Sequence, residues 1–236
     1  MELQRALVAF AHPDDAEFLC GGTVAGWAKE GVEVTYVCAT DGAAGWNGPD
    51  LSREEIAARR KAEMLEVAGM LGVHEVRFLD HPDGMLQASL DLRRDLTREV
   101  RRTRPDVLVS FDPSRLWSGR SYINHPDHRA VGEAILAVVA CDAPTRPQFP
   151  ELIEEGLEPF KVRRLWLATD ARDADHAVDI AETIELKVRA LAAHLSQMEN
   201  MGEFDAEAKV REWARAHARG TGYELAERFR TFEIEV

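Results

Sequence analysis

The sequence predicts an α/β protein in which a mostly parallel sheet is covered by helices on both faces, folded as a single domain over residues 1–236. Two observations carry this prediction. Short apolar runs rich in Val alternate with longer segments of helical periodicity through the first half of the chain. Apolar residues make up 45% of the chain and charged residues 30%, which is the composition of a well-packed globular protein rather than a disordered one.

Strands and helices are expected to alternate from the start of the chain, because apolar runs predict strands and the segments between them have helical spacing. The predicted strands of the first half span residues 7–11, 32–39, 76–79 and 106–112, and the predicted helices end at residue 30 or span residues 54–71 and 91–102. The helix 54–71 has local support. Ser52 and Glu55 form the pattern of a capping box, and Gly72 can end the helix.

The second half of the chain is expected to begin with a long surface excursion. Residues 142–162 are rich in Pro and acidic residues and show no clear period. Further strands are expected at residues 164–168, 177–180 and 229–236, and helices at residues 181–196 and 206–219.

Charge and cysteine content exclude several classes of protein. The formal net charge of −13 argues against a nucleic-acid partner, because phosphate binding requires a concentrated basic surface. No apolar run is long enough for a signal peptide or a membrane span, so we expect a cytoplasmic protein with no membrane partner. Cys20, Cys38 and Cys141 lie among apolar neighbours, which predicts three buried structural thiols.

Polar residues follow four of the predicted strands. The carboxyl ends of parallel strands meet at one edge of a sheet, so these side chains should lie close together. They are His12, Asp14 and Asp15 after the first strand, Thr40 and Asp41 after the second, Asp80 and His81 after the third, and Asp112 after the fourth. A helix cap would explain one carboxylate after the first strand, but an imidazole and two carboxylates exceed what a cap requires.

A second polar motif lies in SYINHPDHRAVGEAILAVV, where His125, Asp127 and His128 surround a predicted helix start at Pro126. Catalytic zinc takes three ligands from His, Asp or Glu and leaves a fourth position for water. Two ligands from the first strand end and one from this helix start would form such a site. Spacing alone leaves open which of Asp14 and Asp15, and which of His125 and His128, bind the metal. A third motif, HPDG at residues 81–84, is predicted to be a turn rather than a ligand set.

Five sequence blocks together resemble a known family. AHPDDAEFLCGGT, TDGAAG, RKAEMLEVAGMLGV, HPDH and KVRALAAHLSQM occur in this order between Ala11 and Met198. They are similar to the blocks of the zinc-dependent N-acetylglucosaminyl deacetylases, which include PIG-L and LmbE-like proteins and the mycothiol and bacillithiol pathway deacetylases. The resemblance implies a Rossmann-like fold with Zn²⁺ as cofactor.

The resemblance also implies roles for individual residues. His12, Asp15 and His128 would bind Zn²⁺, Asp14 would be the general base, His125 the acid or electrophile, and Asp127 would orient the His125 ring. Asp41, Arg60 and Glu63 would bind the substrate or support the site. For Arg60 and Glu63 the alternative is a salt bridge on the helix surface.

The implied activity is hydrolysis of the acetyl group from a small-molecule N-acetylglucosamine conjugate by metal-activated water, in a protein that could form a homo-oligomer, a hexamer by analogy. Two alternatives are a zinc amidase that cleaves a larger amide, such as a thiol conjugate, and a sugar-binding module without catalysis. Four more residues lie near the expected site without an assigned role. They are Trp46 and Trp117, which fit either sugar stacking or loop anchoring, and Tyr122 and His194.

Overall fold

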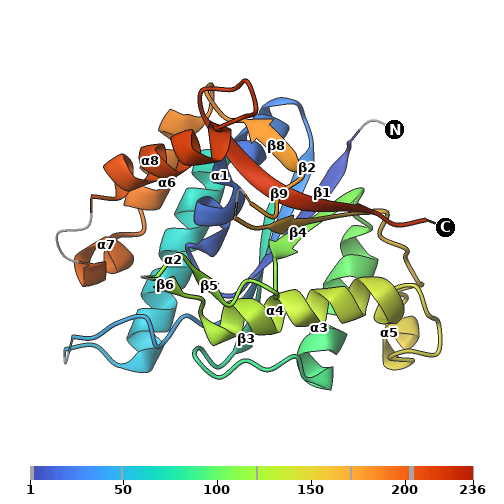
Figure 1. Ribbon diagram of the computed structural model, residues 1–236. Coiled ribbons are helices and arrows are strands. Elements are labelled where there is room, and N and C mark those ends of the chain that lie inside the picture. Colours follow the sequence, from blue (N-terminus) through green and yellow to red (C-terminus); the bar gives the residue numbers. More distant parts are fainter. Residues whose placement is uncertain (1–2, 49, 121, 171, 202–204, 236) are drawn as a thin grey trace.

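One seven-stranded sheet forms the centre of the protein (Figure 1). The computed structural model describes residues 3–48, 50–120, 122–170, 172–201 and 205–235. The strand order is β3-β2-β1-β4-β7-β9-β8. In the described sheet β9 runs opposite to the other six strands, which confirms the mostly parallel prediction. The strands are β1 (Arg5–Phe10), β2 (Glu33–Thr40), β3 (Glu75–His81), β4 (Val107–Phe111), β7 (Arg164–Ala168), β8 (His176–Asp179) and β9 (Ala226–Glu233).

Helices cover both faces of the sheet, as the alternating pattern predicts (Figure 1). Helices α1, α2 and α6 pack together on one side, and α3 and α4 pack together on the other. Strand β1 is therefore buried on both faces, which explains its continuous apolar run. The bounds are α1 (Asp15–Lys29), α2 (Arg53–Leu71), α3 (Leu90–Thr103), α4 (Pro126–Ala137) and α6 (Ile184–Ala192).

Both ends of α2 lie where the sequence predicts them. The Ser52 side chain accepts a hydrogen bond from the Glu55 backbone, and the Glu55 side chain accepts one from the Ser52 backbone, which completes the capping box. Gly72 ends the helix with a φ of 77°, a left-handed conformation that glycine adopts without steric cost.

Two elements of the second half differ from the prediction. The single helix expected over residues 181–196 is divided into α6 and α7 (Leu195–Met201). The break occurs at buried His194, whose ring lies 3.0 Å from Glu17 of α1. Helix α8 (Ala206–Ala218) follows as expected, whereas β9 begins three residues before the predicted position.

Short elements occur where the sequence shows no period. A hairpin of β5 (Trp117–Ser118) and β6 (Tyr122–Ile123) lies where the sequence predicts no strand. A π-helical turn, η1 (Val138–Asp142), and α5 (Glu151–Glu154) lie within or beside the expected excursion. The buried guanidinium of Arg101 donates hydrogen bonds to four backbone carbonyls of this excursion, so the segment is held against α3.

Two of the three cysteines are buried as predicted, Cys20 and Cys38. The prediction was wrong for Cys141, which is exposed because it faces outward from η1. None of the described helices is long and apolar enough to cross a membrane.

Candidate metal centre and active site

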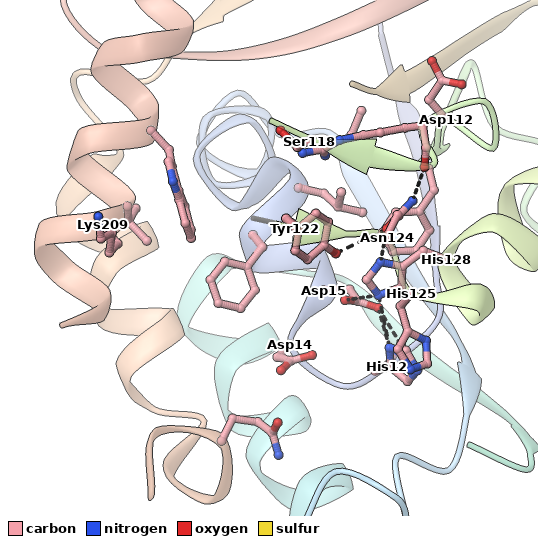
Figure 2. A pocket seen from close by; sticks show the side chains of 18 of the residues that line it. His12, Asp14, Asp15, Asp112, Ser118, Tyr122, Asn124, His125, His128 and Lys209 are labelled. Atoms are coloured by element: carbon pink, nitrogen blue, oxygen red, sulfur yellow. Dashed lines mark hydrogen bonds and ion pairs between the residues drawn. The ribbon is translucent and has the colours of Figure 1, made fainter. Parts of the chain in front are cut away.

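A cavity of about 910 Å³ lies at the carboxyl edge of the sheet (Figure 2). The expectation that polar strand ends meet there is confirmed for the first and fourth strands. The residues that the motifs contribute to the cavity wall are His12, Asp14, Asp15, Asp83, Asp112, Asn124, His125 and His128.

The segment His-Pro-Asp-Asp forms a tight turn between β1 and α1. The backbone N–H of His12 donates to the carboxylate of Asp15 at 2.7 Å, which folds the turn back on itself. Asp14 precedes the helix with a φ of 139°, a conformation that side-chain-bearing residues rarely adopt. Backbone strain of this kind is characteristic of functional positions.

His12, Asp15 and His128 converge on one point. His12 Nδ1 lies 3.2 Å from Asp15 Oδ2 and 3.3 Å from His128 Nε2, and His128 Nε2 lies 3.1 Å from Asp15 Oδ1. Ligand atoms of a tetrahedral ion with bonds of 2.0–2.1 Å are separated by about 3.3 Å. The donor set and its spacing therefore fit a small divalent metal ion.

The opposite nitrogen of His12 faces two carboxylates. His12 Nε2 lies 3.1 Å from Asp83 Oδ1 and 3.3 Å from Asp127 Oδ2. The Asp127 carboxylate also accepts hydrogen bonds from the backbone N–H groups of Gly84 and Leu86. A carboxylate on the remote nitrogen fixes the tautomer of a metal-binding histidine, leaving Nδ1 free to bind metal.

Asp83 is a site residue that the sequence reasoning missed. Its motif was read as a turn, yet Asp83 is 5% exposed and lies against His12. The available signal was a third His-Pro-Asp after a predicted strand, but the strand order that brings it close to His12, with only β2 between β3 and β1, cannot be derived from the sequence.

His128 is held by two further contacts. Its Nδ1 lies 3.0 Å from Asn124 Oδ1, and its ring stacks on Phe111 with centroids 4.2 Å apart and planes 7° apart. Asn124 was also missed, although it directly precedes the second His-Pro-Asp motif. With Nδ1 engaged by an amide oxygen, Nε2 of His128 can point to the metal position.

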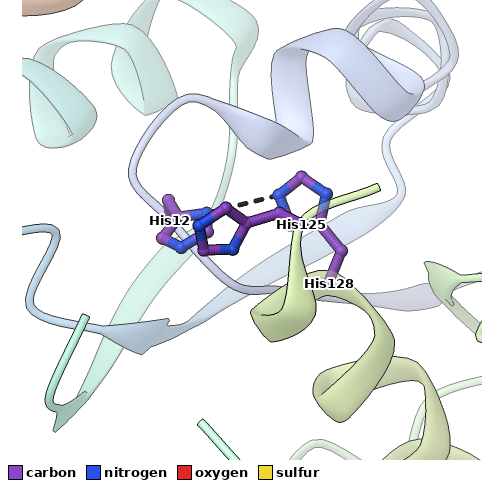
Figure 3. Close-up of side chains that lie close together, drawn as sticks. All are labelled: His12, His125 and His128. Carbon is purple, nitrogen blue, oxygen red and sulfur yellow. Dashed lines mark hydrogen bonds between the residues drawn. The ribbon is translucent and has the colours of Figure 1, made fainter. Parts of the chain in front are cut away.

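Two other groups of possible ligands share His12, namely His12 with His125 and His128 (Figure 3), and His12 with Asp83 and Asp127. The second group uses the nitrogen of His12 that faces away from His128. Asp15 is the better third ligand for His12 and His128, because its carboxylate contacts both rings within 3.2 Å.

Ionisation at this centre follows from burial and close charges. Burial raises the pKa of Asp15, but His128 and His12 outweigh it and the pKa lies well below its usual value. Burial lowers the pKa of His12, but Asp15, Asp127 and Asp83 outweigh it and raise the pKa well above its usual value. A metal ion bound at Nδ1 must therefore displace a proton.

Asp14 lies next to the proposed metal position, but it is not one of the three residues whose side-chain atoms converge there. Burial raises its pKa above the usual value, Arg60 partly offsets this, and Asp15 adds to it. A carboxylate with a raised pKa is a stronger base, which suits proton abstraction near neutral pH.

His125 differs from the expectation in two respects. Its Nδ1 accepts a hydrogen bond from the backbone N–H of Asp127 at 3.2 Å, whereas the Asp127 carboxylate lies on His12. Burial, followed by the charge of His12, lowers the pKa of His125. The lowered pKa favours a neutral His125 with its proton on Nε2, which suits a hydrogen-bond donor better than the acid that the resemblance implies.

The three expected substrate residues lie in different environments. Arg60 is buried and lines the cavity, with Nη2 at 3.3 Å from Asp14 Oδ1 and at 2.9 Å from the Pro13 carbonyl. Glu63 accepts hydrogen bonds from Ser196 at the start of α7, and Asp41 accepts them from Ala43 and Asp83; neither carboxylate is part of the cavity wall. The alternative of an Arg60–Glu63 surface pair is wrong, because both residues are buried and the ion-pair partner of Glu63 is Arg59.

Of the unassigned residues, only Tyr122 lines the described cavity, where its hydroxyl donates to Asn124 at 3.3 Å. Trp46 donates to Asp50, Trp117 is 64% exposed, and His194 is buried against Glu17. No role was assigned from the sequence to Phe18, Phe111 and Trp213 of α8, three aromatic side chains that line the cavity.

Comparisons with known proteins give consistent results. Residues 7–139 match the family model described as PIG-L: GlcNAc-PI de-N-acetylase. The chain is 31% identical over 198 residues to a diacetylchitobiose deacetylase of Thermococcus kodakarensis, covering 83% of this chain and 71% of that protein. It is 29% identical over 205 residues to a probable N-acetyl-alpha-D-glucosaminyl L-malate deacetylase 2 of Bacillus anthracis, covering 82% and 81%. The solved N,N'-diacetylchitobiose deacetylase from Pyrococcus horikoshii superimposes with a TM-score of 0.90 at 32% identity, covering 98% and 85%.

Proposed function

This chain belongs to the PIG-L family of de-N-acetylases, and we propose that it hydrolyses the acetamide of an N-acetylglucosamine conjugate to acetate and a free amino sugar. The observation that carries the proposal is the convergence of His12, Asp15 and His128 beside Asp14, at the wall of one cavity.

Each residue of the site would have a different role in the reaction. His12, Asp15 and His128 would hold a divalent ion, which would supply Lewis acidity and lower the pKa of the attacking water towards ~7. Asp14 accepts the proton of the attacking water, and Arg60, at 3.3 Å, holds the carboxylate in place.

His125 would act on the other side of the reacting carbonyl. One of its ring nitrogens lies within 4.8 Å of a ring nitrogen of His12 and of a ring nitrogen of His128. With Nδ1 accepting from the Asp127 backbone, the Nε2–H can donate a hydrogen bond to the developing oxyanion, and the proton that Asp14 accepts from the attacking water passes to the departing amine. A neutral imidazole can act as this donor without prior protonation.

The test combines metal content with acetate release from N-acetylglucosamine and diacetylchitobiose. We expect Asp14→Asn to retain its metal and lose roughly 10²–10⁴-fold in rate, because it removes only the base. His128→Ala should lose metal, because it removes a ligand. His74→Ala, at an exposed histidine outside the cavity, is the control and should keep both.

Wild-type turnover in both Asp14→Asn and His128→Ala would contradict the proposed mechanism. A protein that binds the sugars but releases no acetate in the presence of metal would support the alternative of a sugar-binding module. The larger-amide alternative is less favoured, because the relatives named above are deacetylases of sugar conjugates.

The proposal also includes the identity of the metal ion, the location of the protein and its assembly. We propose zinc as the ion because the donor set is two imidazoles and one carboxylate in tetrahedral spacing, although iron or cobalt suits the same ligands. A cytoplasmic location and a homo-oligomer are proposed with it. Elemental analysis of the isolated protein and light scattering after gel filtration test the metal and the assembly.

A further inference from the structure

The cavity extends from the metal centre to one face of α8. Figure 2 shows Lys209 on this helix, across the cavity from His12, His125 and His128. Residues spaced three to four apart share a helix face, so a single stripe of α8 forms this wall. The stripe consists of Lys209, Val210, Trp213, Ala214 and His217.

Aromatic and apolar side chains dominate this end of the cavity. Phe18 of α1 meets Trp213 with ring centroids 6.1 Å apart and planes inclined by 61°. Trp213 is nevertheless 44% exposed, although it lines the cavity. A large aromatic surface that remains accessible beside a reaction centre suits stacking against the apolar face of a ring.

The charges around the cavity do not favour an anionic group. The four lysines and arginines in the described wall are each paired with a carboxylate, as Arg60 with Asp14, Arg115 with Asp170, Lys187 with Glu227, and Lys209 with Glu212. The described wall also holds six carboxylates, those of Asp14, Asp15, Asp83, Asp112, Asp170 and Glu227. Burial, followed by the charge of Lys187, lowers the pKa of His217 to about 4, so this ring is neutral at pH 7.

We propose that the part of the cavity beside Trp213 is a subsite for a neutral sugar ring attached to the reacting N-acetylglucosamine, with the exposed surface of Trp213 as its stacking surface. The proposal rests on the proposed deacetylation, which places the acetamide beside Asp14 and directs the remainder of the substrate along the cavity. A dicarboxylate such as malate finds no unpaired lysine or arginine in the described wall, whereas a second sugar ring finds an aromatic face.

The test compares acetate release from N-acetylglucosamine, diacetylchitobiose and N-acetylglucosaminyl malate. In the wild type, kcat/KM for diacetylchitobiose should exceed that for the monosaccharide by about tenfold, and the malate conjugate should show no such gain. Trp213→Ala should remove about tenfold of kcat/KM for diacetylchitobiose and leave the monosaccharide nearly unchanged. Tyr223→Ala is the matched control, since Tyr223 is also 44% exposed but lies outside the cavity wall.

A binding measurement separates this proposal from the proposed function. Diacetylchitobiose should bind to Asp14→Asn protein in calorimetry, and the additional change Trp213→Ala should weaken the binding by about tenfold. Absence of acetate from every substrate, with this binding intact, overturns the deacetylase proposal alone. Equal losses for all three substrates in Trp213→Ala, or a preference for the malate conjugate, overturn the subsite.

Discussion

The ring of His12 connects the metal position to a set of carboxylates behind it. Nδ1 faces Asp15 and His128, and Nε2 faces Asp83 and Asp127. The sequence predicted the contacts of His12 with Asp15 and His128, because the two His-Pro-Asp motifs and the residues that directly follow them contain all three. It did not predict the contact with Asp83, because motif spacing along the chain gives no information on which strand ends become neighbours.

Asp83→Asn should weaken metal binding by roughly 10–100-fold, because one carboxylate that orients His12 loses its charge. Metal affinity is measured by competition with a chromogenic chelator. Asp80→Asn is the matched control, three residues earlier in β3: Asp80 is largely exposed and pairs with Lys61, so its substitution should leave the affinity unchanged. Equal affinities for Asp83→Asn and the wild type would show that Asp83 does not orient the ligand.

The strained backbone of Asp14 leads to a prediction about stability. Both Asp14→Gly and Asp14→Ala remove the carboxylate and should be inactive. Glycine tolerates a φ of 139° and alanine does not, so Asp14→Gly should be more stable by about 1–3 kcal/mol. Denaturant unfolding of the two variants gives the difference, and a less stable Asp14→Gly would contradict the assigned strain.

His217 should make the protein less stable in mild acid. Burial is the main cause of its pKa of about 4 in the folded state, against 6.5 for an unperturbed histidine. The unfolded chain therefore binds the proton first, so this contribution to stability is complete above pH 6.5 and lost as the pH falls towards 4. The loss is at most about 3 kcal/mol. The free energy of unfolding of His217→Asn should depend less on pH in this range than that of the wild type, and identical profiles would contradict the shift.

Within single helices and strands, the sequence correctly predicted the features that depend on residues close together in the chain. The capping box of Ser52 and Glu55 and the stop at Gly72 are interactions within a few residues, and both were predicted correctly. The break between α6 and α7 was not predicted, because it depends on the pairing of His194 with Glu17, which is 177 residues away. The β5–β6 hairpin was missed since two-residue strands carry no period.

Two glycines of α2 should respond oppositely to the same substitution. Gly72→Ala should destabilise the protein by about 1–2 kcal/mol, because φ is 77° and an added Cβ would lie 2.9 Å from that of Ala28. Gly69→Ala should stabilise it by up to about 1 kcal/mol, because Gly69 lies inside the helix and an added Cβ meets nothing within 4 Å. Thermal unfolding compares both with the wild type; a gain for Gly72→Ala would contradict the assigned cap.

Across the whole molecule, the metal position joins segments that are far apart in the chain. His12 and Asp15 lie between β1 and α1, and His128 lies in α4 on the other side of the sheet from α1. The alternating pattern predicted the parallel sheet and hence the shared edge. It did not predict the place of β9 between β7 and β8, which no local property of these strands specifies.

Removal of the metal should therefore lower the stability of the entire fold. A ligand present at about 100 times its dissociation constant stabilises the native state by about 2.7 kcal/mol. Calorimetry with and without a chelator should show a higher Tm for the metal-loaded protein, and the difference should nearly vanish in His128→Ala. An unchanged Tm in the wild type would indicate that no ion links these segments.

The position of β9 inside the sheet also constrains the order of events during synthesis. β8 pairs with β9 and with no other described strand, and Glu227 of β9 accepts hydrogen bonds from the backbone of Gly22 and Thr23 in α1. The helix that begins at Asp15 is thus anchored by a strand more than 200 residues later. A nascent chain can complete this part of the sheet only after β9 has left the ribosome, so ribosome-bound chains that have not yet released β9 should expose an unfinished sheet.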